Sequence, residues 1–199
     1  YKYSSEHEEA GSFNSGQGQM MQLWMDMDSE TDYYTANWTL GYNYTRIDGN
    51  GDKVWTYNNA NGNYPSGIST DADYAYVLAY GGNRIDVLDK ASGELHHSIN
   101  LPGTVYIYGG LVVANGSIYI AGKANGWSDN PSNWQYVHQL DMDGKYIESV
   151  FTGVTPYNTA FDGETIWVSA NSNTITGVKI MDKSYGIAVS LEVTDELGN

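Results

Sequence analysis

The sequence contains no cysteine, which excludes a disulfide framework, a thiolate metal site and a cysteine nucleophile. Basic residues are also scarce, because lysine and arginine number nine against 24 aspartates and glutamates, for a net charge of −15. A chain this acidic is repelled by nucleic-acid backbones and anionic membrane surfaces, so we expect no nucleic acid as a partner. The charge is compatible with divalent cations and with basic partners.

Long apolar runs are missing as well. No stretch of about 20 apolar residues occurs, so we expect no membrane insertion. Proline occurs only four times and charged residues make up 17 %, whereas there are 23 glycines and 18 tyrosines. Many glycines and aromatics with little lysine and glutamate favour an all-β fold. A length of 199 residues suits one domain with a substantial core.

A unit of short strands between residues 64 and 101 repeats along the chain. Its middle, 75–83, is a run of β-forming residues followed by a glycine-rich turn, and it is too short for a helix. The segments 117–125 and 165–173 align with it without a gap, with apolar residues at the second to fourth positions and asparagine at the ninth. One equivalent position is aromatic in all three copies, and we expect its side chains to pack between neighbouring sheets: Tyr76, Tyr119 and Trp167.

A turn recurs with the same chemistry in each copy. An aspartate follows an apolar residue and a glycine comes three or four positions later, which suits a turn capped by a side chain and closed at positive φ. The aspartates are spaced by 41, 52 and 41 residues, and an insertion at 126–134 accounts for the longer interval. The four aspartates are Asp48, Asp89, Asp141 and Asp182.

A period near 40 residues, built of short strands, predicts an all-β, β-propeller-like array of about four four-stranded antiparallel blades. The array is either a four-bladed ring or part of a larger propeller, and a β-sandwich with similar hairpins is the alternative fold. An unclosed array exposes strand edges and an apolar end face, which is a reason to expect a partner. The predicted blades are 19–63, 64–103, 104–153 and 154–194, with a polar N-terminal arm or closing strand at 1–18 and a tail at 195–199.

The segment 85–95 resembles the repeat of YVTN-type and quinoprotein-type β-propellers, which commonly reads apolar-x-apolar-Asp-x-x-x-Gly-x-apolar. Weaker copies surround Asp141 and Asp182, so the resemblance covers 64–194 and, more loosely, 19–63. It implies a propeller fold and says little about function, because such propellers serve as enzymes, scaffolds and binding modules. The tryptophan-rich end of quinoprotein blades is missing, so we expect no quinone cofactor.

No catalytic set stands out in the sequence. His96 and His97 are adjacent and would point to opposite faces of a regular strand, so we expect no two-histidine site there. The chain has no His-x-x-x-His spacing for zinc, no Gly-x-Ser-x-Gly elbow and no phosphate-binding loop. A pair of carboxylates assembled from different blades stays open as an alternative.

One stretch is suggestive of calcium, since Asp48, Asn50 and Asp52 place oxygen ligands at alternate positions. Its twelfth position is Asn59 instead of a bidentate glutamate, and Lys53 stands where a calcium loop needs glycine. We therefore interpret the stretch as a turn and keep calcium as the alternative. No other cofactor is expected.

Aromatic residues are the richest feature. Trp127, Trp134 and Tyr136 lie on or next to the polar insertion, where they suit stacking on sugar rings or anchoring a partner protein. The alternative is that they fold back over the blade edge.

These features lead to the hypothesis of a non-catalytic structural and binding module on the outside of a cell or virion, acting by protein–protein or glycan contact within a possible oligomer. The first alternative is a propeller enzyme, a lyase or hydrolase, with its site at the ring centre. An intracellular scaffold is the second.

Overall fold

The computed structural model describes residues 2–3, 9–11, 24–27, 32–37, 43–58, 64–108, 110–125, 134–170, 175–179 and 191–194. Within these ranges every regular element is a β-strand, as the composition predicts. None of the described residues forms a helix long and apolar enough to cross a membrane.

Four antiparallel sheets follow one another along the chain. The first contains β3 (Trp24–Met27), β4 (Tyr33–Asn37), β5 (Asn43–Ile47) and β6 (Lys53–Asn58). The second contains β7 (Pro65–Thr70), β8 (Tyr74–Ala79), β9 (Gly82–Asp89) and β10 (Leu95–Tyr106). The third contains β11 (Leu111–Ala114), β12 (Ser117–Ala121), β14 (Tyr136–Asp141) and β15 (Tyr146–Phe151). The fourth contains β16 (Pro156–Phe161), β17 (Thr165–Ala170), β18 (Ile175–Lys179) and β19 (Leu191–Thr194).

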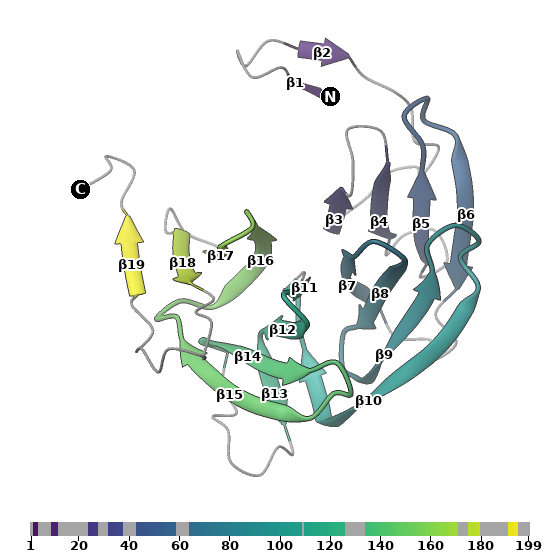
Figure 1. Ribbon diagram of the computed structural model, residues 1–199. Helices are drawn as coiled ribbons and strands as arrows, with labels where there is room; N and C mark the ends of the chain where they lie inside the picture. The colour runs from purple at the N-terminus through teal and green to yellow at the C-terminus, as the bar shows by residue number, and fades with distance from the viewer. Residues whose placement is uncertain are drawn as a thin grey trace.

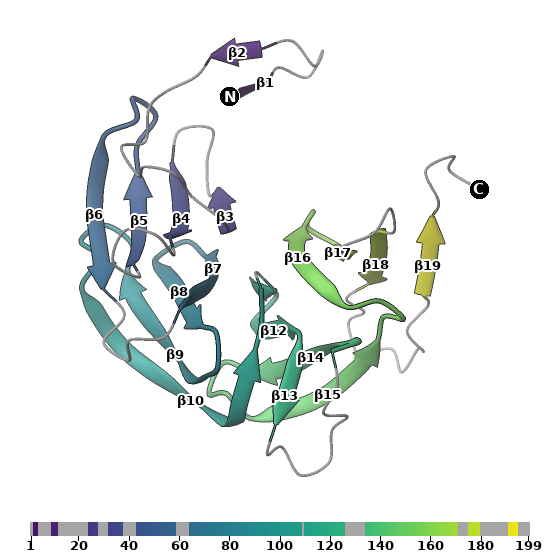
Figure 2. The ribbon, with the colours of Figure 1, turned by 180° about the vertical axis from the view of Figure 1, so that it is seen from behind.

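The sheets stand around a common axis like the blades of a propeller, which confirms the predicted fold (Figure 1). The first strand of each sheet, β3, β7, β11 or β16, lies innermost, and the last strand lies outermost (Figures 1 and 2). The described strands form an open arc in which the fourth sheet does not reach the first. A short hairpin of β1 (Lys2–Tyr3) and β2 (Glu9–Gly11) lies near the opening.

The second blade has one strand more than the expected four. β13 (Lys123–Asn125) comes from the third blade and pairs with the end of β10, so that Tyr106 lies opposite Lys123. Gly122 makes this possible, because a Cβ added there would lie 2.3 Å from the Tyr106 carbonyl oxygen. The segment just before the insertion of the third repeat therefore forms a strap that ties two neighbouring blades together.

Apolar side chains fill the space between each pair of neighbouring sheets. This follows from strand geometry, because successive side chains point to opposite faces and both faces of an inner sheet must be covered. Tyr34, Tyr44 and Trp55 of the first sheet pack against Ile68 and Val77 of the second. The largest cluster lies between the second and third sheets and includes Leu78, Ile85, Val87, Ile118, Ile120 and Leu140. Val112, Tyr119, Ile166, Val168 and Val178 fill the space between the third and fourth.

The aromatic position shared by three repeats has different surroundings in the last one. Tyr76 is buried between the second and third sheets, and Tyr119 is buried between the third and fourth, as the repeat predicts. Trp167 instead lies half-buried on the outer face of the last sheet, with its ring over Gly177 and its Nε1 donating to Asp162 Oδ2 at 2.7 Å. Tyr76 makes the matching bond, from its hydroxyl to Asp71 at 2.7 Å.

His138 stabilises the point where the chain leaves β12 of the third blade and enters β13. Its side chain is fully buried, with Nε2 3.0 Å from the Gly122 carbonyl oxygen and Nδ1 2.7 Å from Ser149 Oγ. A carbonyl only accepts, so Nε2 carries the proton and Nδ1 accepts from the serine hydroxyl. Burial disfavours the charged ring and lowers the pKa of His138 from 6.5 to about 4.

Acid should therefore destabilise the fold through His138. The unfolded chain binds a proton at this residue below a pH of about 6.5, whereas the folded protein does not until about pH 4, so the stability falls as the pH drops through this window. The loss reaches about 3 kcal/mol at pH 4, at about 1.4 kcal/mol for each unit of pKa difference. An NMR titration of the His138 ring should give a midpoint near pH 4. In urea denaturation, the stability difference between wild type and His138→Gln should narrow as the pH falls from 7 to 4.5, and a ring midpoint near 6.5 would contradict the assignment.

Candidate functional site

A stack of three aromatic rings lies on the face of the array where the innermost strands begin. The Tyr108 ring is stacked on Trp134 on one side, with centroids 5.3 Å apart, and on Tyr157 on the other, at 4.9 Å. The planes in both pairs are inclined by only 13°. The three rings come from different places in the fold: the connection before β11, the approach to β14, and β16.

Two more tyrosines extend this stack. Tyr80 follows β8, Tyr106 ends β10, and their centroids lie 5.2 Å apart, while Tyr80 also meets the Tyr108 ring at 5.5 Å. Antiparallel pairing brings the end of β8 and the end of β10 to the same face as the start of β16. Burial and the hydrogen bond with Tyr108 raise the pKa of Tyr80 above its usual value, so the phenol stays protonated. We call the five residues Tyr80, Tyr106, Tyr108, Trp134 and Tyr157 the aromatic cluster.

All five rings of the aromatic cluster are half-buried, so each keeps part of its surface in contact with solvent. Aromatic rings of this kind offer a large, rigid contact area, and the phenol hydroxyls add hydrogen-bonding groups. The cluster can therefore hold an apolar or flat surface of a ligand without further ordering of its own side chains.

The predicted binding residues are only partly brought together. Trp134 joins the aromatic cluster, whereas Tyr136 packs against Phe151 and lies at 6.2 Å from the His138 ring. Trp127 lies outside the described residues, and a binding role for all three stays a prediction. Sequence reasoning missed the other members of the cluster, and only the tyrosines flanking Ile107 give any local sign of it.

The stretch proposed as a calcium alternative forms a tight turn. The Asp48 carboxylate accepts hydrogen bonds from the backbone N–H of Asn50 at 2.9 Å and of Asp52 at 3.0 Å. The carboxylate thus caps its own turn, as the preferred interpretation requires. Among the described side chains, no group of three or more histidine, aspartate or glutamate residues gathers to hold a metal ion. Calcium binding at this turn stays a prediction.

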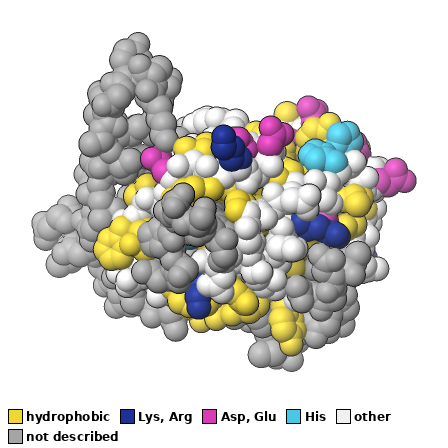
Figure 3. Space-filling model, turned by 90° about the horizontal axis from the view of Figure 1, so that it is seen from below, with side chains coloured by type: hydrophobic (Ala, Val, Ile, Leu, Met, Phe, Trp, Pro, Cys, Tyr) yellow, Lys and Arg dark blue, Asp and Glu magenta, His cyan; other side chains and the backbone are white. Residues whose placement is uncertain are grey.

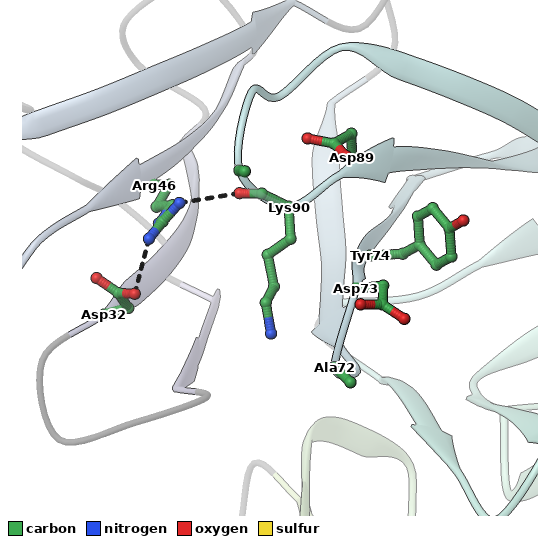
Figure 4. A pocket seen from close by; sticks show the side chains of 8 residues that line it. Asp32, Arg46, Ala72, Asp73, Tyr74, Asp89 and Lys90 are labelled. Atoms are coloured by element: carbon green, nitrogen blue, oxygen red, sulfur yellow. Dashed lines mark hydrogen bonds and ion pairs between the residues drawn. The ribbon is translucent and has the colours of Figure 1, made fainter.

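A polar pocket of about 450 Å³ lies between the first two blades, on the face opposite the aromatic cluster (Figure 4). Arg46 on β5 forms an ion pair with Asp32 at 2.8 Å and donates to the Lys90 carbonyl oxygen at 3.1 Å. The same carbonyl accepts a hydrogen bond from Trp55 Nε1 at 2.9 Å, and the Lys90 ammonium donates to the Asp71 carbonyl. The charged groups therefore hold the turn of the second blade against the first. The lining residues are Asp32, Arg46, Ala72, Asp73, Tyr74, Asp89, Lys90 and Ala91.

The two adjacent histidines lie next to this pocket and do not have the predicted orientation. Leu95 pairs with Leu88 and His97 with Val87, so His96 is an extra residue without a partner in the ladder. This bulge brings both rings together, with their Nδ1 atoms 2.8 Å apart. The prediction that the side chains point to opposite faces is wrong, because the alternation of a regular strand does not hold across a bulge.

Comparisons with known proteins support the fold alone. Scans against family models and curated proteins find no match. Among solved structures, hydrazine synthase of Kuenenia stuttgartiensis is 15 % identical with a TM-score of 0.57, and the match covers 93 % of this chain and 53 % of that chain. The Pan2 WD40 domain of Neurospora crassa is 15 % identical with a TM-score of 0.56, covering 97 % and 58 %. The WD40 β-propeller domain of Doa1 is 14 % identical with a TM-score of 0.55, covering 81 % and 52 %.

The chain therefore has a β-propeller architecture and spans about half the length of these structures. At such low identity, a shared fold does not indicate a shared activity. The resemblance to propeller repeats is confirmed at the level of the fold, and its assignment to the YVTN or quinoprotein type stays a prediction.

Proposed function

We propose that the chain is a non-catalytic binding module that takes a partner protein on its aromatic cluster. The observation that carries this proposal is the stack of Trp134, Tyr108 and Tyr157, which is assembled from the third and fourth blades and is only partly buried. Tyrosine and tryptophan are enriched among the residues that dominate binding energy in protein interfaces, because they bury a large area at little entropic cost. An extracellular, cell-surface or virion location is part of the same proposal.

Two features of the surroundings support a protein partner. Tyr64, at the start of the second blade, is 47 % exposed, and Phe151, whose ring packs on Tyr136, is 51 % exposed. These side chains add apolar contact area beyond the cluster itself. The net charge of −15 favours a partner with a basic surface, since opposite charges speed up and orient the encounter. A glycan is the alternative ligand, since sugar rings also stack on aromatic faces.

The test compares two single-ring variants with a matched control on the opposite face. Trp134→Ala and Tyr157→Ala should each weaken partner binding by about 30-fold, which corresponds to the roughly 2 kcal/mol typical of an interface anchor. Leu95→Ala removes a side chain that is 49 % exposed at the start of β10, and should leave binding unchanged. The partner protein is first isolated by its binding to the immobilised wild-type chain. Its affinity for each variant is then measured by surface plasmon resonance, and a glycan array is screened in parallel. Equal losses in the three variants, or binding on the glycan array alone, would contradict the proposal.

A further inference from the structure

The outermost strand of the third blade, β15, has an unpaired edge. It is the last strand in the order of its sheet, and no other described strand pairs with its far side. The Thr152 N–H, directly after β15, bonds across to the chain that leads into β14 at 2.9 Å. Bonded and unbonded residues alternate along an antiparallel strand, so Val150 is also bonded to β14. Ser149 and Phe151 therefore direct their backbone N–H and C=O groups outward.

The outermost strands of the first two blades are protected at their edges in ways that β15 is not. Natural sheets avoid unwanted edge pairing by lysine, proline, bulges or a covering segment. β6 begins with Lys53 next to a bulge, and β10 contains the bulge at His96, Pro102 and the strap β13. The irregularity of the β14–β15 ladder lies where β15 begins, and residues 147–151 contain neither lysine nor proline. This part of the edge is therefore open to another strand.

Two exposed apolar side chains flank the middle of this edge. Ile147 is 41 % exposed and Phe151 is 51 % exposed, and they lie two residues on either side of Ser149. β15 lies at the lower rim of the array in Figure 1, and the view from below shows many hydrophobic side chains on that side and few lysines or arginines (Figure 3). The surface around the edge therefore favours an apolar contact over an ionic one.

The spacing makes this edge complementary to itself. When two copies pair antiparallel about Ser149, each Ile147 lies opposite the Phe151 of the other chain, and pairs of aromatic and β-branched residues stabilise sheets. Glu148 then lies opposite Val150, so no two carboxylates face each other across the contact. The same register joins the outward groups of Ser149 to their counterparts, and the Phe151 N–H to the Ile147 carbonyl.

We propose that two copies of this chain associate through β15, so that the sheet of the third blade continues into that of the second copy around a twofold axis. A twofold contact uses the same surface on both chains, and the assembly therefore closes as a dimer. The pairing of two single edges is small for a protein interface, and the net charge of −15 on each chain opposes it. The dimer is therefore in equilibrium with the monomer and becomes tighter as salt screens the repulsion.

This association goes beyond the proposed binding function and is testable apart from it. None of the five residues of the aromatic cluster lies on β15. Trp134→Ala should therefore weaken partner binding and leave the dimer unchanged, whereas substitutions at Ile147 should act on the dimer. Phe151 adds contact area in both proposals, so it does not distinguish them.

Sedimentation equilibrium of the full chain tests the association. The wild type should show a mass that rises with concentration towards twice 21.9 kDa, with a tighter dimer at high salt than at low salt. Ile147→Lys and Phe151→Lys should each raise the dissociation constant about 100-fold, because each position occurs twice in the contact and each lost side chain costs roughly tenfold. Val54→Lys is the matched control, since Val54 is 46 % exposed on the outermost strand of the first blade. It adds the same charge and should leave the dimer unchanged.

Hydrogen exchange measured by NMR locates the contact within the strand. The backbone amides of Ser149 and Phe151 should exchange slowly in concentrated wild type and rapidly in Ile147→Lys, whereas the Val150 amide should be protected in both. The substituted side chains are exposed, so the near-ultraviolet circular dichroism of the variants should match that of the wild type. A wild-type monomer at every concentration, a dimer that salt weakens, an unchanged dimer in both β15 variants, or an equal loss in Val54→Lys would each overturn the proposal.

Discussion

Replacing Asp86 by alanine is expected to lower the free energy of unfolding by about 3 kcal/mol. Its carboxylate is 5 % exposed and accepts hydrogen bonds from Tyr57 at 2.9 Å and Ser98 at 2.7 Å, besides an ion pair with Arg84 at 2.9 Å. Tyr57 belongs to the first blade and the other three residues to the second. Without the carboxylate, two hydroxyls and a guanidinium lose their partner at this junction.

The expected loss lies at the lower end of the range for buried charged pairs, because Arg84 is 31 % exposed and keeps access to water. Burial and the bond to Asp86 raise the pKa of Tyr57 to about 12, so the phenol remains a donor at neutral pH. Asp86→Asn retains one acceptor oxygen and should cost less than alanine does. Urea denaturation measures both, with the exposed Asp143→Ala as control, expected to change stability by less than about 0.5 kcal/mol. Equal effects of the alanine variants at the two positions would refute a role for this network.

The second large effect is expected for Ile118→Ala, at about 4 kcal/mol. Ile118 on β12 is completely buried, lies opposite Leu140 in the ladder and belongs to the cluster between the second and third blades. The substitution removes three buried side-chain carbons. It leaves a cavity that the flanking sheets can fill only in part.

Ile147→Ala provides a control with the same chemical change. Ile147 on β15 is 41 % exposed, so its truncation should cost less than about 1 kcal/mol. Urea denaturation curves with unchanged slopes give both values. Similar losses for the two isoleucines would mean that the space between the second and third blades is not the main source of stability.

The local chemistry of the turns explains why the repeat could be predicted. Asp48, Asp89 and Asp141 each cap their turn through backbone N–H groups, as the spacing of aspartate and glycine indicates. Gly93 and Gly144 adopt φ values of 74° and 84°, which explains the glycine at these positions. Such signals lie within a few residues of one another, so they are legible in the sequence.

The strap β13 and the bulge at His96 were not predictable in the same way. β13 exists because three residues of the third repeat find a partner in β10, and their sequence gives no sign of where they pair. The bulge depends on the register between β9 and β10, which a strand pattern does not contain. A one-residue change in register reverses the faces of all side chains beyond it, which is why the orientation of His96 and His97 was predicted wrongly.

By itself the sequence determined an all-β chain, its short strands, its capped turns and their recurrence at about 40 residues, because each of these depends on neighbours along the chain. Only the tertiary structure decided that Trp134 stacks on Tyr108, that Arg46 reaches the turn at Lys90 and that two histidine nitrogens meet at 2.8 Å. The physical reason is that these contacts join segments far apart in the sequence, join different blades, or cross an irregular ladder. Their geometry follows from how the sheets pack around the axis, and no spacing in the sequence encodes it.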